Sequence, residues 1–467
     1  MDVRRISLRH RYGVPPSLVL LLALALGSTP LGCSPTVQEQ PAAGPAGTGP
    51  AAPPPPPVAT TPPTESAPSG AASPSPAPPS AADQDKTTDT IPTPFVSPLS
   101  QDELDDGWIS LFDGDTTYGW RAATQANWKV DDGAITVSTG EAGLLCTQVP
   151  WSNYELQVDF RFAPGTNSGI FLHTPLIPRD PQRDCYELNI AEPAVSPFPT
   201  GSLVGRAKAA ESAAQAAPDT WHHYDITVDG PQVVVKLNGQ PALEYTDPQP
   251  LGRGFIGLQL NKGAVAFKGI KLRPLGLKEL FNGRDLSGWR QYPEMKSRFT
   301  VTAQGELHVQ DGRGQLETEA QFGDFVVQLN CRTNAPRLNS GLFFRCVPGG
   351  EMLGYESQIH NGFQGGDRTK PVDCGTGGIF RRTQARLVAA DDLTWFTKTI
   401  VAVGPEVAVW VNGYQVTQWT DDRPPDENPR KGLRLAAGTF QLQGHDPTTD
   451  ILFRDLRAVE LTPRRPD

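Results

Sequence analysis

Short runs of alternating apolar and polar residues recur along the chain from about residue 101 onward. Residues 154–160 (YELQVDF) alternate at every position, as a strand with one buried face must. Residues 233–239 and 407–413 each run an apolar segment into an Asn-Gly pair, which tolerates the positive φ angles of a tight hairpin turn. Only residues 206–217 have high helical propensity. The pattern predicts an all-β protein of many short strands, arranged as sandwiches or jelly rolls.

These strands belong to an internal repeat. Segments of the first copy return in the same order in the second: LFDG at 111–114 as LFNG at 280–283, NSGIF at 167–171 as NSGLF at 339–343, and LQ at 258–259 as LQ at 442–443. The two copies are about 170 residues apart. A repeat of this length predicts two tandem β-sandwich domains of similar size, at 101–275 and 276–463.

The first hundred residues differ from the rest in composition. Four arginines precede an apolar run at 18–26, and Cys33 follows; this is the order of an export signal that ends in a lipoprotein cleavage site. Residues 34–100 are rich in Pro, Ala, Ser and Thr, which predicts a disordered tether. We therefore expect a signal peptide at 1–33, and a protein of the cell envelope or extracellular space held at the membrane by a lipid on Cys33. Ordinary secretion, with Cys33 as an incidental residue, is the alternative.

Charge and cysteine content narrow the class of partner. The formal net charge is −10, and Lys and Arg form no cluster, which argues against a nucleic-acid partner. Five cysteines follow Cys33; an odd number leaves at least one thiol free or paired outside the chain. No spacing of Cys and His is typical of a structural zinc site. Cys346 and Cys374 are a candidate disulfide pair.

The second copy carries six short motifs in order. They are LFNGRDLSGW at 280–289, NSGLFFR at 339–345, GYESQI at 354–359, TGGIF at 376–380, LQGHD at 442–446 and FRDL at 453–456. Together they resemble the 3-keto-disaccharide hydrolase family, and the resemblance extends over both predicted domains. It implies a concanavalin-like jelly-roll fold, a carbohydrate partner, and cleavage of disaccharides or glycosides whose C3 hydroxyl has been oxidised to a ketone.

The chemistry implied by this resemblance differs from that of ordinary glycosidases, which use paired carboxylates. A ketone at C3 acidifies the hydrogen at C2, so a base can remove that proton and the aglycone can leave by elimination, after which water adds. Such a site needs a base, groups that stabilise an enolate, and an acid for the leaving oxygen. Hydrolysis and elimination both stay open, as does a divalent cation that polarises the ketone.

Polar residues of the second copy supply candidates for these roles. Glu356 and Gln358 lie two apart on a predicted strand and therefore share a face, which His360 continues. Such a row is costly to bury unless the face lines a cleft; a solvated outer face is the alternative. The catalytic candidates are Glu356, His360, His445 and Asp446. The substrate-binding candidates are Arg345, Gln358 and Gln443, with an Arg345–Glu356 ion pair as the alternative role of the arginine.

The first copy departs from the family pattern at several of these positions. Its counterparts of the candidate residues are His173, Glu187, Asn189 and Gln259, and Asn261-Lys262 replaces the His-Asp pair. We therefore expect catalysis in the second copy and a binding or scaffolding role for the first. A non-catalytic carbohydrate-binding protein and a cell-surface interaction protein are the competing functions. We expect the glycines of both NSG motifs to serve through their backbone freedom.

Overall fold

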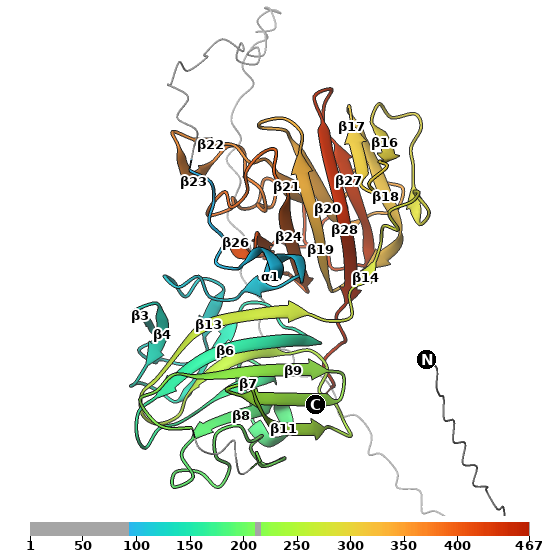
Figure 1. Cartoon of the computed structure of the whole chain (residues 1–467). Helices are drawn as coiled ribbons and strands as arrows, with labels where there is room; N and C mark the ends of the chain where they lie inside the picture. The colour runs from blue at the N-terminus through green and yellow to red at the C-terminus, as the bar shows by residue number, and fades with distance from the viewer. Residues whose placement is uncertain (1–92, 211–215, 467) are drawn as a thin grey trace, which may run out of the picture. The chain divides into compact units, whose positions relative to one another are not determined.

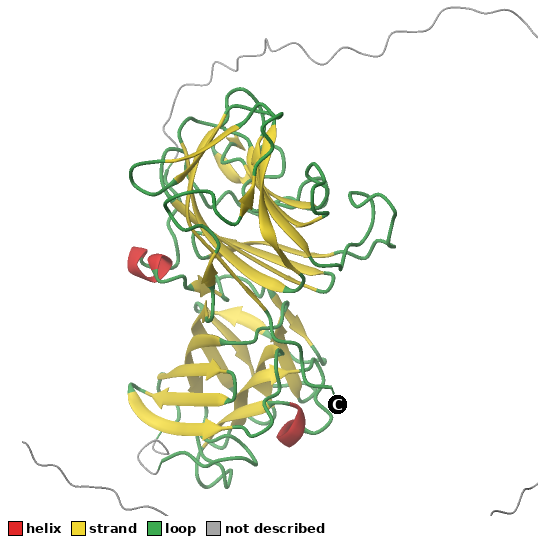
Figure 2. Cartoon of the chain, turned by 90° about the vertical axis from the view of Figure 1, so that its right-hand side faces the viewer, coloured by secondary structure: helices red, strands yellow, loops and turns green. Residues whose placement is uncertain are grey.

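The computed structural model describes residues 93–210 and 216–466. The predicted signal peptide, Cys33 and residues 34–92 of the predicted tether lie outside the described residues. The described residues contain two short helices, α1 (Gln101–Asp105) and α2 (Pro181–Asp184). Figure 1 labels α1 and many of the strands. No helix in the described part of the chain is long and apolar enough to cross a membrane. Nearly every other regular element is a strand, so the predicted all-β class is confirmed (Figure 2).

The first sandwich consists of an eight-stranded and a five-stranded sheet, all antiparallel. The order of the larger sheet is β11-β10-β9-β6-β13-β4-β3, with β1 also paired to β13, and that of the smaller is β2-β5-β12-β7-β8. The strands are β1 (Ile109–Ser110), β2 (Trp120–Ala122), β3 (Lys129–Asp131), β4 (Ala134–Val137), β5 (Gly143–Thr147), β6 (Tyr154–Phe162), β7 (Asn167–Thr174), β8 (Tyr186–Ala191), β9 (His222–Asp229), β10 (Gln232–Leu237), β11 (Gln240–Thr246), β12 (Phe255–Leu260) and β13 (Val265–Pro274).

The second sandwich repeats this architecture. Its larger sheet has the order β16-β17-β28-β19-β24-β25-β26, with β14 paired to β28, its smaller sheet has the order β15-β18-β27-β20-β21, and β22 and β23 form a separate hairpin. The strands are β14 (Lys278–Glu279), β15 (Trp289–Arg290), β16 (Arg298–Val301), β17 (Leu307–Gln310), β18 (Gly314–Phe322), β19 (Phe325–Thr333), β20 (Ser340–Cys346), β21 (Tyr355–Ile359), β22 (Phe363–Gln364), β23 (Asp367–Pro371), β24 (Phe396–Val403), β25 (Glu406–Val411), β26 (Tyr414–Thr420), β27 (Gly438–Gly444) and β28 (Asp450–Glu460).

Alternation along each strand places one set of side chains between the sheets. On β6 the residues from Tyr154 to Phe162 alternate between buried and more exposed positions, as the sequence pattern predicts. Both expected Asn-Gly turns form, with positive φ at Asn238 and Asn412. The residues expected to be helical at 206–210 form no helix; residues 211–215 are outside the description.

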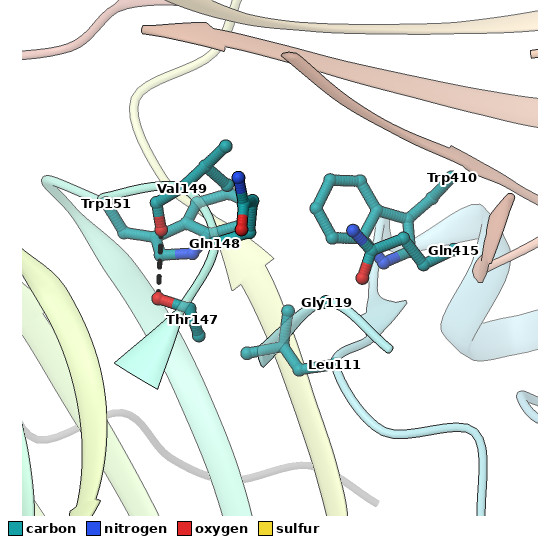
Figure 3. Close-up of a pocket in the computed structure, with 8 residues that line it drawn as sticks. All are labelled: Leu111, Gly119, Thr147, Gln148, Val149, Trp151, Trp410 and Gln415. Atoms are coloured by element: carbon teal, nitrogen blue, oxygen red, sulfur yellow. Dashed lines mark hydrogen bonds between the residues drawn. The ribbon is translucent and has the colours of Figure 1, made fainter. Parts of the chain in front are cut away.

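The two sandwiches pack against each other through apolar side chains. Trp151 of the first and Trp410 of the second have ring centroids 5.8 Å apart, and the indole Nε1 of Trp410 donates to the carbonyl oxygen of Ser110 at 2.8 Å. Figure 3 shows both tryptophans, together with Leu111, among the residues that line the small cavity at this contact. The cavity left between them is only about 10 Å³, so this contact is a packed interface and not a ligand site.

The end of the predicted tether also packs on the second sandwich. The Phe95 ring lies 5.8 Å from that of Tyr414, the hydroxyl of Ser97 donates to the carbonyl of Asn412 at 2.9 Å, and Leu99 is buried. The expectation that the disordered segment extends to residue 100 was therefore wrong for these residues, because their apolar side chains find partners that composition does not reveal.

Candidate active site

The outer face of the smaller sheet of the second sandwich carries two rows of polar side chains. In register across β18, β27, β20 and β21, the first row is Glu317, Gln441, Phe343 and Glu356. The second row includes Gln315 opposite Gln443 and Gly341 opposite Gln358. Leu316, Leu442 and Leu342, between the rows, point into the core. The strands therefore present a polar outer face over an apolar core.

Three members of these rows were not predicted. Gln315, Glu317 and Gln441 are each buried and polar. Their signal in the sequence is the alternation of polar residues in two otherwise apolar runs, Gln315-Leu316-Glu317 and Gln441-Leu442-Gln443, which is the same pattern that identified Glu356 and Gln358.

Glu356 lies in a largely buried position on this face. Only 9% of the residue is exposed. Burial raises the pKa of its carboxyl to about 7, although the positive charge of Lys398 opposes the shift. No side chain in the described part of the chain forms an ion pair with this carboxyl. A carboxyl in this state is close to half ionised at neutral pH, as a general base requires.

Gly341 makes room for this carboxyl. A Cβ atom at Gly341 would lie 2.8 Å from Oε1 of Glu356 and 2.9 Å from its Cγ, closer than atoms in contact can approach. Gly341 lies within β20 and is absent from the residues with positive φ. The expectation that the NSG glycines serve through backbone freedom was therefore wrong for Gly341: its φ is not positive, and it leaves space for the Glu356 side chain.

Gln358 and His360 extend the face beyond Glu356. The amide of Gln358 donates to Oδ1 of Asn339 at 2.6 Å, and Cys374 approaches Oε1 of the same side chain at 3.7 Å. His360 is buried, and its ring Nδ1 accepts from the backbone N–H of Gly362 at 3.2 Å. Burial lowers the pKa of His360, so its imidazole is mainly neutral at pH 7.

His445 and Asp446 lie at the far end of the same sheet. The chain turns there, because the Thr449 hydroxyl accepts from the backbone N–H groups of both residues at 3.0 and 3.1 Å. Nδ1 of His445 and Oδ2 of Asp446 are 2.8 Å apart. From strand spacing and rise, the Cα atom of His445 is on the order of 16 Å from that of Glu356. The register of the strands thus places Glu356, Gln358 and Gln443 on one face of this sheet, with the His-Asp pair just beyond the end of β27.

The expected role of Arg345 was wrong. Its guanidinium is 1% exposed and donates to backbone carbonyl oxygens of Gly323, Gly404 and Arg434 and to Asp324, at 2.7–3.1 Å. A β-bulge between Phe343 and Cys346 breaks the alternation of β20, so Arg345 points away from Glu356. It connects loops of the fold and contacts neither Glu356 nor the polar rows.

His173, the counterpart of Arg345, has the same structural position. It is 2% exposed and also has positive φ. A ring nitrogen lies 2.6 Å from the carbonyl oxygen of Ser152. Burial lowers the pKa of His173 to about 4, so the ring is neutral at physiological pH and is a packing residue of the first sandwich.

The loop between β20 and β21, residues 347–354, covers part of the polar face. Its backbone is held by the side chains of the polar rows: Met352 N–H donates to Gln315 and Gln441 at 2.9 and 3.0 Å, Gly349 N–H donates to Glu317 at 3.1 Å, and the Gly350 carbonyl accepts from Gln441 at 2.9 Å. The Met352 side chain packs on Phe343, the cross-strand neighbour of Glu356. The loop therefore forms an apolar wall beside Glu356.

Glu317 has the opposite electrostatic environment to Glu356. Burial would raise its pKa, but hydrogen bonds from Thr439, Tyr292 and the Gly349 N–H outweigh burial and lower it. Glu317 is therefore ionised, and its oxygens accept hydrogen bonds from Tyr292 and Thr439 as well as from the Gly349 N–H of the loop. Of the two carboxyls, only that of Glu356 is poised to exchange a proton near pH 7.

The corresponding face of the first sandwich has lost most of its polar residues. Cys146, Gly257 and Leu144 stand in register where the second sandwich has Glu317, Gln441 and Gln315. Glu187 remains, but it accepts a hydrogen bond from Gln259 at 3.2 Å. Leu144 and Cys146 join Phe171 and Cys185 in an apolar cluster.

The described residues contain no disulfide. The five cysteines of the described residues are free and buried, so the candidate Cys346–Cys374 disulfide was wrong. Burial raises the pKa of Cys374 to about 12, which makes it unreactive. Across residues 93–210 and 216–466, no group of three or more His, Cys, Asp or Glu side chains has an arrangement that would hold a metal ion.

Comparison with known proteins found a family model that matches both sandwiches. A model described as a 3-keto-alpha-glucoside-1,2-lyase-like domain matches residues 107–273 and again residues 276–458. A 3-keto-disaccharide hydrolase of Bacteroides thetaiotaomicron is 27% identical over 110 residues, which are 19% of this chain and 38% of that protein; the chain thus spans well under half the length of this relative.

Two solved structures are also similar. A proposed glycosyl hydrolase from Parabacteroides distasonis is 19% identical with a TM-score of 0.35, covering 38% of this chain and 98% of that one. A carbohydrate-binding module from Bacillus subtilis is 15% identical with a TM-score of 0.27, covering 36% of this chain and 93% of that one.

Proposed function

From the premise that this chain belongs to the 3-keto-alpha-glucoside-1,2-lyase-like family, with two copies of its domain, we propose that its second sandwich cleaves 3-keto-glycosides by elimination. The family makes the chain a carbohydrate-active protein. The observation that carries the finer proposal is Glu356, a buried carboxyl whose pKa burial raises to about 7, on a face that also carries Gln358 and Gln443.

In the proposed reaction the carboxylate of Glu356 removes the proton at C2 of the keto sugar. The electron pair of the C2–H bond forms an enolate on the C3 oxygen, which the amide N–H groups on this face stabilise. The enolate then expels the oxygen at C1: the C1–O bond breaks, a C1–C2 double bond forms, and the leaving oxygen takes up a proton from Glu356 or from water. Addition of water to the enone completes a net hydrolysis.

The other predicted residues have secondary places in this proposal. His360 lies further along the strand that carries Glu356, and His445 and Asp446 lie at the end of the sheet. We assign them to contacts with the more distant part of the substrate. The first sandwich serves as a scaffold, because Glu187 is engaged by Gln259 and its neighbours are apolar.

The test is to incubate the full chain with 3-keto-sucrose, 3-keto-trehalose and a chromogenic 3-keto-glucoside in deuterated water, with and without a chelator. Elimination produces an enone intermediate and leaves solvent deuterium at C2 of the product, whereas direct hydrolysis leaves C2 unlabelled. Glu356→Gln should lower kcat by a factor on the order of 100 or more, and the matched change Glu187→Gln should leave it unchanged. Absence of turnover on all three compounds, with glycan binding retained, would favour a carbohydrate-binding protein instead.

We also propose that the protein acts at the cell envelope, anchored by a lipid on Cys33. The support is the order of arginines, apolar run and cysteine in residues 1–33. Mass spectrometry of the mature amino terminus should find a lipidated Cys33, and Cys33→Ser should move the protein from the membrane fraction to the soluble fraction. An unmodified Cys33 in a soluble mature protein would support ordinary secretion.

A further inference from the structure

A lysine is buried in the core of the second sandwich. Lys398 on β24 has a relative exposure of 0% and lies on the same face of that strand as Phe396 and Ile400, which belong to the apolar core. No carboxylate of the described residues forms an ion pair with it. A buried ammonium group without an ion pair is costly, so its retention requires an explanation.

The ammonium of Lys398 contacts the strand that carries Glu356. Its Nζ donates to the carbonyl oxygens of Ser357 at 2.7 Å and Gln358 at 2.9 Å, and the Gln358 carbonyl also accepts from the backbone N–H of Gly377 at 2.9 Å. The side chains of Glu356 and Gln358 point to the outer face of this strand. Lys398 therefore lies behind the candidate site, on the inner side of the same sheet.

The first sandwich offers a comparison within the same chain. At the equivalent position on β9, the hydroxyl of Tyr224 donates to the carbonyl oxygen of Asn189 at 2.8 Å, and Asn189 is the counterpart of Gln358. A neutral hydroxyl is thus sufficient to hold this strand. Holding the strand does not by itself explain why the second sandwich has a charged group here.

We infer that Lys398 is a positioning residue for the proposed elimination: it fixes the backbone of β21 and supplies, from inside the core, the positive charge that keeps Glu356 able to ionise. This inference rests on the function proposed above. Lys398 does not touch the substrate, and it acts only through the strand and the charge of Glu356.

The other charged groups around Glu356 differ from Lys398 in exposure. Asp373 disfavours the carboxylate, whereas Arg430 and Arg381 favour it, and all three are exposed, where salt screens them. The neighbouring thiols are neutral, because burial raises the pKa of both Cys346 and Cys374. Of the four charged groups that act on Glu356, Lys398 is buried and the other three are exposed, so salt screens the charge of Lys398 least.

The protonation state of Lys398 is consistent with this role. Burial lowers the pKa of its ammonium to about 8, and the nearby Glu356 partly opposes the shift. The side chain is therefore mainly charged at pH 7. Between the two pKa values, at pH 7 to 8, the carboxylate of Glu356 and the ammonium of Lys398 are both mainly charged and stabilise each other through the sheet.

The experiment compares Lys398→Tyr, which installs the residue of the first sandwich, with Lys398→Met in the full chain. The ionisation midpoint of Glu356 is measured by carbon NMR of labelled glutamate carboxyls, with Glu356→Gln as the assignment control, and the pH profile of kcat/KM is measured on a 3-keto-glucoside. Both variants should raise the midpoint and the ascending limb by about one pH unit, so that kcat/KM falls about tenfold at pH 6 and recovers at higher pH.

Lys398→Tyr separates the charge from the structural contact, because tyrosine retains a hydrogen bond to the Gln358 carbonyl. It should keep a Tm close to that of the unmodified protein, and it carries the test if Lys398→Met does not fold. An unchanged Glu356 midpoint in folded Lys398→Tyr would overturn the inference. Absence of turnover in the unmodified protein would instead contradict the proposed function, and the NMR titration would still decide the role of Lys398.

Discussion

Gln259 donates a hydrogen bond to Glu187 across Gly169 in the first sandwich, at 3.2 Å. In the second sandwich the corresponding amide, that of Gln443, lies 3.4 Å from the sulfur of Met352 instead, and its Oε1 has no hydrogen-bond partner among the described residues. The loop that carries Met352 thus draws the amide away from Glu356. One sheet therefore contains a satisfied carboxyl and its repeat contains one that is available to a substrate.

The close approach of the Glu356 side chain to Gly341 leads to the first prediction. Gly341→Ala places a methyl group within 2.8 Å of the Glu356 carboxyl and should reduce stability by about 1–3 kcal/mol, together with most of the activity. In a Glu356→Ala background the same change should cost much less, because the clashing group is gone. Urea denaturation of the unmodified protein, the two single variants and the double variant gives four free energies of unfolding, from which the coupling between residues 341 and 356 follows.

Gly323→Ala is the control for that cycle, since its added methyl would meet nothing closer than 3.8 Å. Equal costs of Gly341→Ala with and without the Glu356 carboxyl would show that the glycine serves the backbone and not the side chain.

The pKa of Glu356 predicts how stability depends on pH. The carboxyl has an ordinary value of 4.5 in the unfolded chain and about 7 in the folded protein, so the folded state binds more protons between these values. Stability therefore falls as pH rises from about 4.5 to about 7. Glu356→Gln removes this loss. The free energy of unfolding of the variant, relative to that of the unmodified protein, should therefore increase by up to about 3 kcal/mol between pH 5 and pH 8.

Urea denaturation at both pH values checks this prediction. Glu187→Gln is the matched control, because the hydrogen bond from Gln259 opposes the effect of burial on the Glu187 pKa; its advantage should grow less. A constant difference between Glu356→Gln and the unmodified protein across this range would contradict the raised pKa.

Much of the fold can be read from the sequence because it depends on local patterns. Alternation at 154–160 and the two Asn-Gly turns identify strands and hairpins without knowledge of their partners. The same alternation identifies the shared face of Glu356 and Gln358, and it would have identified Gln315 and Glu317. Patterns of this kind repeat every two residues and need no tertiary information.

The remaining features of the site depend on contacts between distant segments. Arg345 lies within a β-bulge, which reverses the side that alternation assigns to it. The state of Glu356 depends on Met352 from a loop and on Lys398 from the opposite sheet. The sequence does not state which loop covers which strand, so neither the burial of Glu356 nor the charge behind it could be predicted.

The contacts of Arg345 predict a structural role that kinetics can separate from binding. Arg345→Met removes the donors to three backbone carbonyls and to Asp324 and should cost about 3–5 kcal/mol of stability. Under conditions where the variant is folded, kcat and KM should match those of the unmodified protein. Thermal denaturation and steady-state kinetics on one preparation test both statements, and a raised KM at unchanged Tm would restore the substrate-binding role.

The indole of Trp410 predicts that the two sandwiches unfold together. It is 2% exposed, donates to Ser110 at 2.8 Å, and belongs to the same apolar cluster as Trp151. Truncating a buried tryptophan typically reduces the free energy of unfolding by about 3–5 kcal/mol. Because Trp410 packs against the first sandwich, its truncation should weaken the contact between the two sandwiches. Calorimetry should therefore find one transition in the unmodified protein and two in Trp410→Ala.

Trp221→Ala is the control, because Trp221 is covered by Arg161 and Lys268 of the first sandwich. This variant should still unfold in a single transition. Two transitions in the unmodified protein would show that the sandwiches are energetically independent, and the first would then lose its role as a scaffold for the second.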